Sequence, residues 1–230
     1  MLETVKYLMG SAGSSGFGSK STADQVTAGA DLRSITAIIT GATSGIGAET
    51  ARVLAKHGAR LVLPARSLKA AEDTKARIVS ECPDSEILVM ALDLSSLNSV
   101  RNFVAEFESL NLPLNLLINN AGKFAHEHAI SEDGIEMTFA TNYLDMVFFM
   151  ASKLLKTIPQ AAATTCYVAA HPRLSNVSGK YFADCNEASS TSKLGSSSTE
   201  AARLWSASEI MVSRDPKAVF DPLNATDYGA

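Results

Sequence analysis

The chain has 230 residues, of which 46% are hydrophobic and 19% charged, and its net charge is −4. This length suits one domain, and the apolar content excludes wholesale disorder. No run of lysine and arginine favours a nucleic-acid surface, and no stretch of about 18 uncharged apolar residues predicts a membrane-spanning helix. The three cysteines lack a metal-binding spacing, which favours free thiols in a reducing compartment. We therefore expect a globular protein without a metal, nucleic-acid or membrane-spanning site.

The start of the chain differs from its periodic body. Residues 10–20 are rich in glycine and serine and are expected to be flexible. Ser21 or Thr22 can then cap a short helix that ends near Thr27. The periodic pattern begins at residue 34, and a serine-rich tail with one short helix, Glu200 to Met211, ends the chain. The sequence thus predicts three segments: 1–33, 34–186 and 187–230.

Strands and helices alternate along the first part of the periodic body. Apolar, β-branched runs predict strands at 35–40, 60–65, 86–92 and 114–118. Helices are expected from Ile46 to Lys56, from a cap at Ser67 to Ser80, and after a cap at Ser95. This alternation indicates βαβ units and an α/β fold of Rossmann type, a parallel sheet with helices on both faces.

A glycine-rich turn, TGATSGIG at residues 40–47, joins the first strand to the first helix. Gly41 permits the tight turn, Gly45 lets the backbone approach a pyrophosphate, and Gly47 allows close packing of helix on strand. The helix N-terminus offers free N–H groups and positive potential to phosphates. We expect this loop to bind a dinucleotide through Gly41, Thr43, Ser44, Gly45, Ile46 and Gly47.

The charge after the second strand predicts which dinucleotide is bound. An acidic residue there would accept hydrogen bonds from the ribose 2′-hydroxyl of NAD, whereas a basic residue accommodates the 2′-phosphate of NADP. The strand ends in Arg66, and no aspartate or glutamate follows before Glu72. We therefore predict NADP(H).

Two further motifs accompany the glycine-rich turn. Asp93-Leu94 follows the third strand, and Asn119-Asn120-Ala121-Gly122 follows the fourth. In this order the three motifs resemble the short-chain dehydrogenase/reductase superfamily over residues 34–144. The resemblance implies that Asp93 and Leu94 flank the adenine. It also implies that the second motif, with Asn120, Ala121 and Gly122, supports the sheet end and the cofactor.

The resemblance extends to finer features. Asn142, in TFATNYL, matches the family's catalytic helix asparagine, which holds a proton-relay water. The stretches PLNLLINNAG and ISEDGIEMTFATN are similar to the plant branch related to retinol dehydrogenases, which includes a member associated with the chloroplast inner-envelope translocon. The resemblance implies an oxidoreductase.

The family's tyrosine–lysine pair is not found. A tyrosine with a pKa near ~10 needs a cation one helical turn later to work as an acid or base at neutral pH. No tyrosine of this chain has a lysine four places on, and Phe149 to Lys153 offers the lysine without the hydroxyl. We interpret this as an internal deletion near Asp145 that removes roughly 60–100 residues, including the strand with the catalytic serine.

Because of the proposed deletion, we expect the second half of the chain to differ from the family's fold. Helix is expected from Glu132 to Ile158, ended by Pro159, and again at 160–170. A strand at 179–184 would join the sheet in parallel, as the fifth strand in the order 3-2-1-4-5. The deletion would remove the strands that once covered an edge of this sheet. Such an uncovered edge favours self-association or pairing with a full-length relative.

Three functions stay open. The first is an NADP(H)-binding protein with impaired catalysis. The second is an active NADP-dependent oxidoreductase on an aldehyde, ketone or alcohol, with Tyr143, His126 or His128 as acid or base. The third is a truncated product without a folded function. We expect a cytoplasmic protein, with the chloroplast as the alternative, because residues 1–33 lack the arginine-rich, acid-poor composition of a transit peptide.

Overall fold

The computed structural model describes residues 9–122, 156–188 and 197–212. By its internal contacts the chain divides into two compact units, Met1–Ala188 and Ser189–Ala230. The described element of the second unit is helix α8, Ser198–Val212, which confirms the helix predicted there. All other described elements belong to the first unit.

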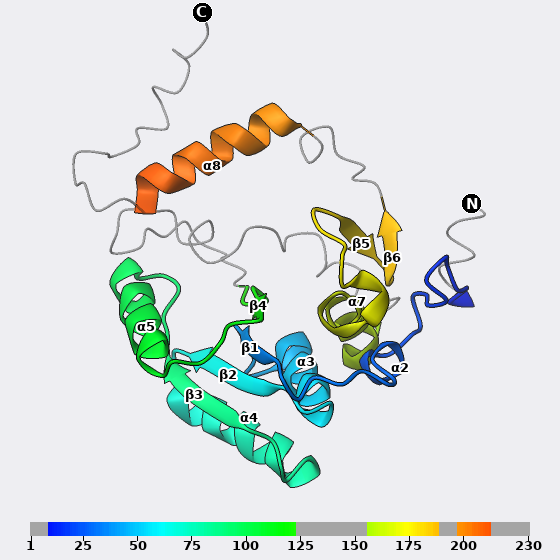
Figure 1. The fold of residues 1–230 in the computed structure, drawn as a ribbon, viewed down its shortest axis with the longest axis horizontal. Coiled ribbons are helices and arrows are strands. Elements are labelled where there is room, and N and C mark those ends of the chain that lie inside the picture. Colours follow the sequence, from blue (N-terminus) through cyan, green and yellow to red (C-terminus); the bar gives the residue numbers. More distant parts are fainter. Residues whose placement is uncertain (1–8, 123–155, 189–196, 213–230) are drawn as a thin grey trace, which may run out of the picture. The chain divides into compact units, whose positions relative to one another are not determined.

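A parallel sheet forms the centre of the first unit (Figure 1). Its described strands lie in the order β3-β2-β1-β4. Every pairing is parallel, with Ala37 opposite both Leu61 of β2 and Leu116 of β4. These strands confirm the four that the apolar runs predict: β1 Thr36–Ile39, β2 Arg60–Ala65, β3 Ile87–Ala91 and β4 Leu116–Ile118.

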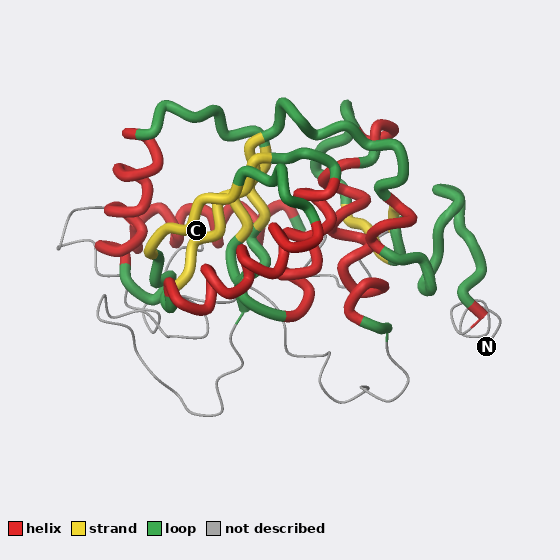
Figure 2. The backbone as a smooth tube through the Cα atoms, turned by 90° about the horizontal axis from the view of Figure 1, so that it is seen from below, coloured by secondary structure: helices red, strands yellow, loops and turns green. Residues whose placement is uncertain are grey.

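Helices cover both faces of the sheet, as the fold class requires (Figure 2). Ile39 and Leu61 point to one face and are fully buried with Leu54 of α3, while Ile38 and Val62 point to the other and pack with the phenylalanines of α5. This alternation follows from the two-residue period of a strand. The covering helices are α3 Gly45–Lys56, α4 Leu68–Glu81 and α5 Leu97–Ser109.

Of the caps predicted for α4 and α5, the first is confirmed and the second is wrong. Ser67 caps α4 by accepting a hydrogen bond from the backbone N–H of Ala70, as predicted. The cap of α5 is Ser96, whose side chain accepts from Ser99 N–H, so the prediction of Ser95 was wrong. The hydroxyl of Ser95 is engaged elsewhere, because it donates to the carboxylate of Asp93 (2.6 Å).

The strand predicted at 179–184 is confirmed as β5, but its predicted place in the parallel sheet was wrong. β5, Tyr181–Ala183, pairs antiparallel with β6, Asn186–Ala188, in a hairpin separate from the main sheet. The turn residues Asp184 and Cys185 both have positive φ, 50° and 63°. Such a two-residue turn reverses the chain at once, so β5 takes its partner locally and not at the edge of the sheet. The described sheet has four strands, and the order 3-2-1-4-5 does not hold.

Helix α7, Ile158–Ala170, packs against α3 and the short helix α2, Ala23–Val26 (Figure 1). Its buried face shares a core cluster with Val53 of α3 and Val26 of α2. Pro159 lies in its first turn, where the missing N–H costs nothing. The helix expected from Glu132 to Ile158 lies almost entirely outside the described residues.

The glycine- and serine-rich segment makes defined contacts. The side chain of Asn186 accepts a hydrogen bond from Ser15 N–H (2.9 Å) and donates to Phe17 O (3.0 Å). The Phe17 ring meets that of Tyr167 edge-on, with centroids 5.6 Å apart. Thr22 caps α2, as one of the two predicted alternatives. Residues 10–20, expected to be flexible, are therefore anchored to the β5–β6 hairpin and α7.

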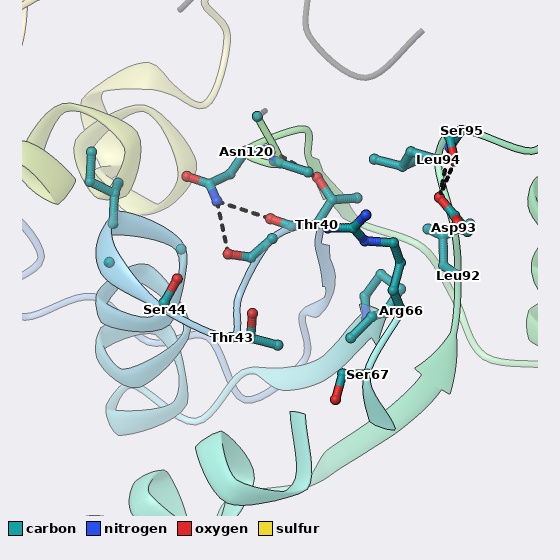
Figure 3. A pocket seen from close by; sticks show the side chains of 18 residues that line it. Thr40, Thr43, Ser44, Arg66, Ser67, Leu92, Asp93, Leu94, Ser95 and Asn120 are labelled. Carbon is teal, nitrogen blue, oxygen red and sulfur yellow. Dashed lines mark hydrogen bonds between the residues drawn. The ribbon is translucent and has the colours of Figure 1, made fainter. Parts of the chain in front are cut away.

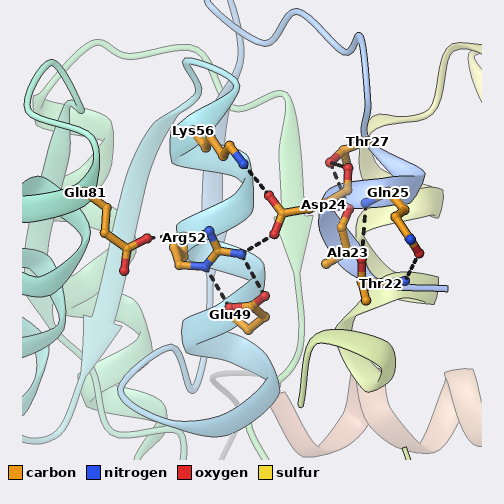
Figure 4. Close-up of polar contacts among 9 residues, drawn as sticks. All are labelled: Thr22, Ala23, Asp24, Gln25, Thr27, Glu49, Arg52, Lys56 and Glu81. Atoms are coloured by element: carbon orange, nitrogen blue, oxygen red, sulfur yellow. Dashed lines mark hydrogen bonds and ion pairs between the residues drawn. The ribbon is translucent and has the colours of Figure 1, made fainter. Parts of the chain in front are cut away.

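A group of ionic side chains joins the first helices (Figure 4). Asp24 of α2 accepts hydrogen bonds from Arg52 (2.5 Å) and Lys56 (2.6 Å) of α3. Arg52 also pairs with Glu49 one turn earlier at 2.8 Å and with Glu81 of α4 at 3.6 Å. One guanidinium thus connects α2, α3 and α4.

Candidate cofactor-binding site

A pocket of about 860 Å³ opens at the carboxyl ends of the strands (Figure 3). Parallel α/β sheets bind their ligands at this edge. The pocket is lined by every cofactor residue that the sequence predicts: Gly41, Thr43, Ser44, Gly45, Ile46, Gly47, Arg66, Asp93, Leu94, Asn120, Ala121 and Gly122. The fold thus brings together residues from four different loops.

Two glycines of the loop are required by close packing. Gly41 has a φ of +65°, and a Cβ there would lie 2.7 Å from the Cα of Ala121. A Cβ on Gly47 would lie 2.4 Å from both the Asn120 side-chain nitrogen and the carbonyl oxygen of Gly41. Any larger residue would therefore push the loop away from the end of β4.

Gly45 is required for a different reason. Its φ is +55°, a conformation that other residues adopt at a cost, yet nothing lies within 4 Å of where its Cβ would be. The backbone here faces open space at the start of α3. Ser44, the N-cap of α3, makes no side-chain capping hydrogen bond. The first turn of α3 therefore keeps its N–H groups for an anionic group in the pocket.

Asn120 connects the end of β4 to the glycine-rich loop. Its side-chain nitrogen donates to the carbonyl oxygens of Thr40 (3.0 Å) and Gly41 (3.4 Å). The Thr40 hydroxyl accepts from the backbone N–H groups of Asn120 (3.0 Å) and Ala121 (2.9 Å). Thr40 is thus a residue of the site that sequence reasoning missed, although it opens the recognised motif.

Arg66 lies at the rim of the pocket, directly after β2, and is exposed. In the described ranges its guanidinium has no hydrogen-bond or ion-pair partner. Ser67 lines the pocket beside it, although the sequence indicates Ser67 only as a helix cap. A free cation and a hydroxyl next to a helix N-terminus form a suitable surface for a phosphate.

Asp93 holds the loop after β3 in place. Its carboxylate accepts hydrogen bonds from the N–H (2.9 Å) and hydroxyl (2.6 Å) of Ser95, and its own N–H donates to Ser99 (2.8 Å). Leu94 follows at the pocket wall, together with Leu92. The arrangement offers an apolar wall at the side of the pocket remote from Ser44 (Figure 3).

The residues predicted for the chemical step belong to a part of the chain that the structure does not describe. Asn142, Tyr143, His126 and His128 fall outside the described residues. Two tyrosines are described, and neither lines the pocket. One of these, Tyr167, is 3% exposed within the core cluster of α7.

Neither the buried thiol of Cys166 nor a cluster of metal ligands offers further chemistry in the described part of the chain. Burial raises the pKa of the Cys166 thiol to about 12, so this cysteine is unreactive at neutral pH. Among the described residues there is no cluster of His, Cys, Asp or Glu suited to a metal ion. No described helix has the length and apolar character needed to cross a membrane.

The chain matches the short chain dehydrogenase family over residues 35–168. It is 34% identical to the short-chain dehydrogenase TIC 32 A, chloroplastic, of Brassica napus, covering 89% of this chain and 97% of the relative. It is 44% identical to the WW domain-containing oxidoreductase of Gallus gallus, covering 54% of this chain and 30% of the relative. A metagenomic short-chain oxidoreductase solved in complex with NADP is 35% identical, with a TM-score of 0.38 over 40% of this chain and 41% of that chain.

The alignment with the Brassica protein is longer than this chain. It extends over 310 positions, whereas 89% of 230 residues is only about 205. The difference means that about 105 aligned positions of the relative have no counterpart here. The relative is nevertheless matched over 97% of its length, so the missing positions lie between matched ends.

Proposed function

The chain belongs to the short-chain dehydrogenase family, and from that premise we propose that it binds NADP(H) but is impaired in catalysis. The pocket is the observation that supports binding most strongly. The residues expected to contact the phosphates, the ribose and the adenine all line it. The open space at Gly45 and the uncapped start of α3 fit a pyrophosphate. Arg66 and Ser67 fit a 2′-phosphate.

The proposed impairment of catalysis is supported by an internal gap in the alignment with the Brassica relative. About 105 positions of the Brassica relative have no counterpart, in accord with an internal deletion around Asp145. In the family the lost region would contain the serine, tyrosine and lysine that handle the proton. The alternative of an active enzyme depends on Tyr143, His126 or His128, and no contact of the described residues favours it. A product without a folded function is disfavoured because all the predicted cofactor residues line one pocket.

The same proposal includes a cellular compartment and an association with other chains. The Brassica relatives are chloroplastic by name, which supports the chloroplast as the compartment over the cytoplasm. The loss of central elements supports self-association or pairing with a full-length relative. Localisation of a fluorescently tagged chain tests the first statement, and co-purification of differently tagged chains tests the second.

The cofactor claim is tested by titrating the protein with NADPH and NADH and following fluorescence. We expect tighter binding of NADPH. Arg66→Asp should weaken NADPH binding about tenfold to a hundredfold, because a hydrogen bond to a charged group is lost and a like charge faces the phosphate. NADH binding should not weaken.

Lys69→Asp is the matched control, since Lys69 is an exposed cation three residues after Arg66, in α4, and does not line the pocket. It makes the same change in net charge and should leave the preference for NADPH in place. Equal affinity for both dinucleotides in the unmodified protein would contradict the role of Arg66. No binding of either would contradict the proposed function itself.

A further inference from the structure

Thr74 of α4 reaches the glycine-rich loop from outside the pocket. It is 1% exposed, and its hydroxyl lies 3.2 Å from the carbonyl oxygen of Thr43 and 3.1 Å from that of Ala70. Arg77, one turn further along α4, donates a hydrogen bond to the same hydroxyl oxygen at 2.9 Å. Neither Thr74 nor Arg77 lines the pocket.

A buried threonine in a helix often donates to the carbonyl one turn earlier, and this alone would carry no function. Thr27 does so, at 2.8 Å from Ala23 O. Thr74 differs because its second acceptor, Thr43 O, belongs to a loop 31 residues away in sequence. Since Arg77 occupies a lone pair of the oxygen, the hydroxyl proton is directed to the two carbonyls.

The contact fixes the orientation of one peptide group. The carbonyl of Thr43 and the N–H of Ser44 belong to the same planar trans peptide, so they point in opposite directions. A carbonyl held on α4 therefore turns the Ser44 N–H away from α4. In the described ranges this N–H donates to no acceptor of the protein, and both residues line the pocket.

We propose that Thr74, oriented by Arg77, is a positioning residue that locks the Thr43–Ser44 peptide so that its N–H, and not its carbonyl, is available to a phosphate of the dinucleotide. The proposal rests on the proposed cofactor function. It matters for binding because a phosphate is attracted by an N–H and repelled by a carbonyl oxygen. It also connects α4, which follows Arg66, to the pyrophosphate loop.

The test compares Thr74→Val, Thr74→Ser and Thr27→Val. Valine removes the hydroxyl and keeps the shape, whereas serine keeps the hydroxyl. We expect Thr74→Val to weaken NADPH binding about tenfold, the equivalent of one lost hydrogen bond. Thr74→Ser should bind within about twofold of the unmodified protein. Thr27→Val should lower the melting temperature to a similar degree and leave NADPH binding unchanged.

A second measurement needs no ligand. In the free protein, Thr74→Val should shift the backbone amide resonances of Thr43 and Ser44, and Thr27→Val should not. NADPH affinity unaffected by Thr74→Val, or a serine variant as weak as the valine variant, would overturn the proposal. Undisturbed amide resonances would overturn it as well. If the unmodified protein binds no dinucleotide, the proposed function fails, and the resonances still decide whether Thr74 holds the loop.

Discussion

At the scale of single residues, the pocket separates glycines needed for packing from a glycine needed for the ligand. Gly41 and Gly47 contact the residues after β4 so closely that a methyl group cannot fit. Gly45 has room for one, but that room is the space a pyrophosphate would occupy. Substitutions at these positions should therefore have different consequences.

Gly45→Ala should weaken NADPH binding strongly while the fold survives. The alanine must adopt a φ of +55°, which costs about 1–2 kcal/mol of stability, and its methyl group enters the pocket. Gly29→Ala is the control, because Gly29 also has a positive φ (+82°) and open surroundings but does not line the pocket. Chemical denaturation should show similar losses for both variants, and only Gly45→Ala should lose affinity. Equal NADPH affinity in the two would contradict this assignment.

Much of the site could be predicted from the sequence because its motifs are local. The strand–turn–helix pattern around Gly41 to Gly47 and the position of Arg66 can be recognised from neighbouring residues alone. Thr40 and Thr74 could not be found in this way, since their roles depend on hydrogen bonds to residues far along the chain. Two adjacent serines, Ser95 and Ser96, are equivalent as caps in sequence, and only the geometry of α5 separates them.

At the scale of elements, local patterns predicted strands and helices but not every partner. β5 is apolar enough for a sheet, yet its turn, Asp184-Cys185, lacks the glycine that signals a hairpin. Residues 10–20 have the composition of a linker, and their anchor, Asn186, lies 171 residues from Ser15. Contacts over such separations leave no trace in the local pattern.

The attachment of α2 to α3 should depend on pH through Asp24. Burial favours its neutral form, but the hydrogen bonds from Lys56 and Arg52 outweigh this and lower the pKa from 3.8. A carboxyl with a lowered pKa stabilises the fold above its unfolded-state value and loses that contribution as the pH falls through the folded value. Asp24→Asn should thus cost on the order of 1 kcal/mol near neutral pH.

The measurement is the free energy of unfolding of both proteins across the acid range. The difference between them should stay constant at neutral pH and shrink as the pH falls below about 3.8. Asp73→Asn serves as a control, because Asp73 is an exposed carboxyl of α4. A difference that persists at the lowest pH would show that the ionic contacts do not attach α2.

At the scale of the whole molecule, the described sheet ends at β4. Leu117 of β4 is 56% exposed, and Leu114 just before it is 47% exposed. An apolar edge strand invites pairing with another chain. We expect the protein to elute from size exclusion above the 24.3 kDa of one chain. Leu117→Lys should reduce this association and leave NADPH binding intact, whereas a compact, high-melting monomer would contradict the expectation.

The central claim is that the chain keeps the phosphate-binding half of a dehydrogenase without the half that transfers the proton. The most direct test is to load the protein with NADPH and follow NADPH consumption over a panel of aldehydes and ketones. We predict saturable binding and no oxidation above the protein-free rate. Oxidation of bound NADPH that Tyr143→Phe or a substitution of His126 or His128 abolishes would contradict the claim.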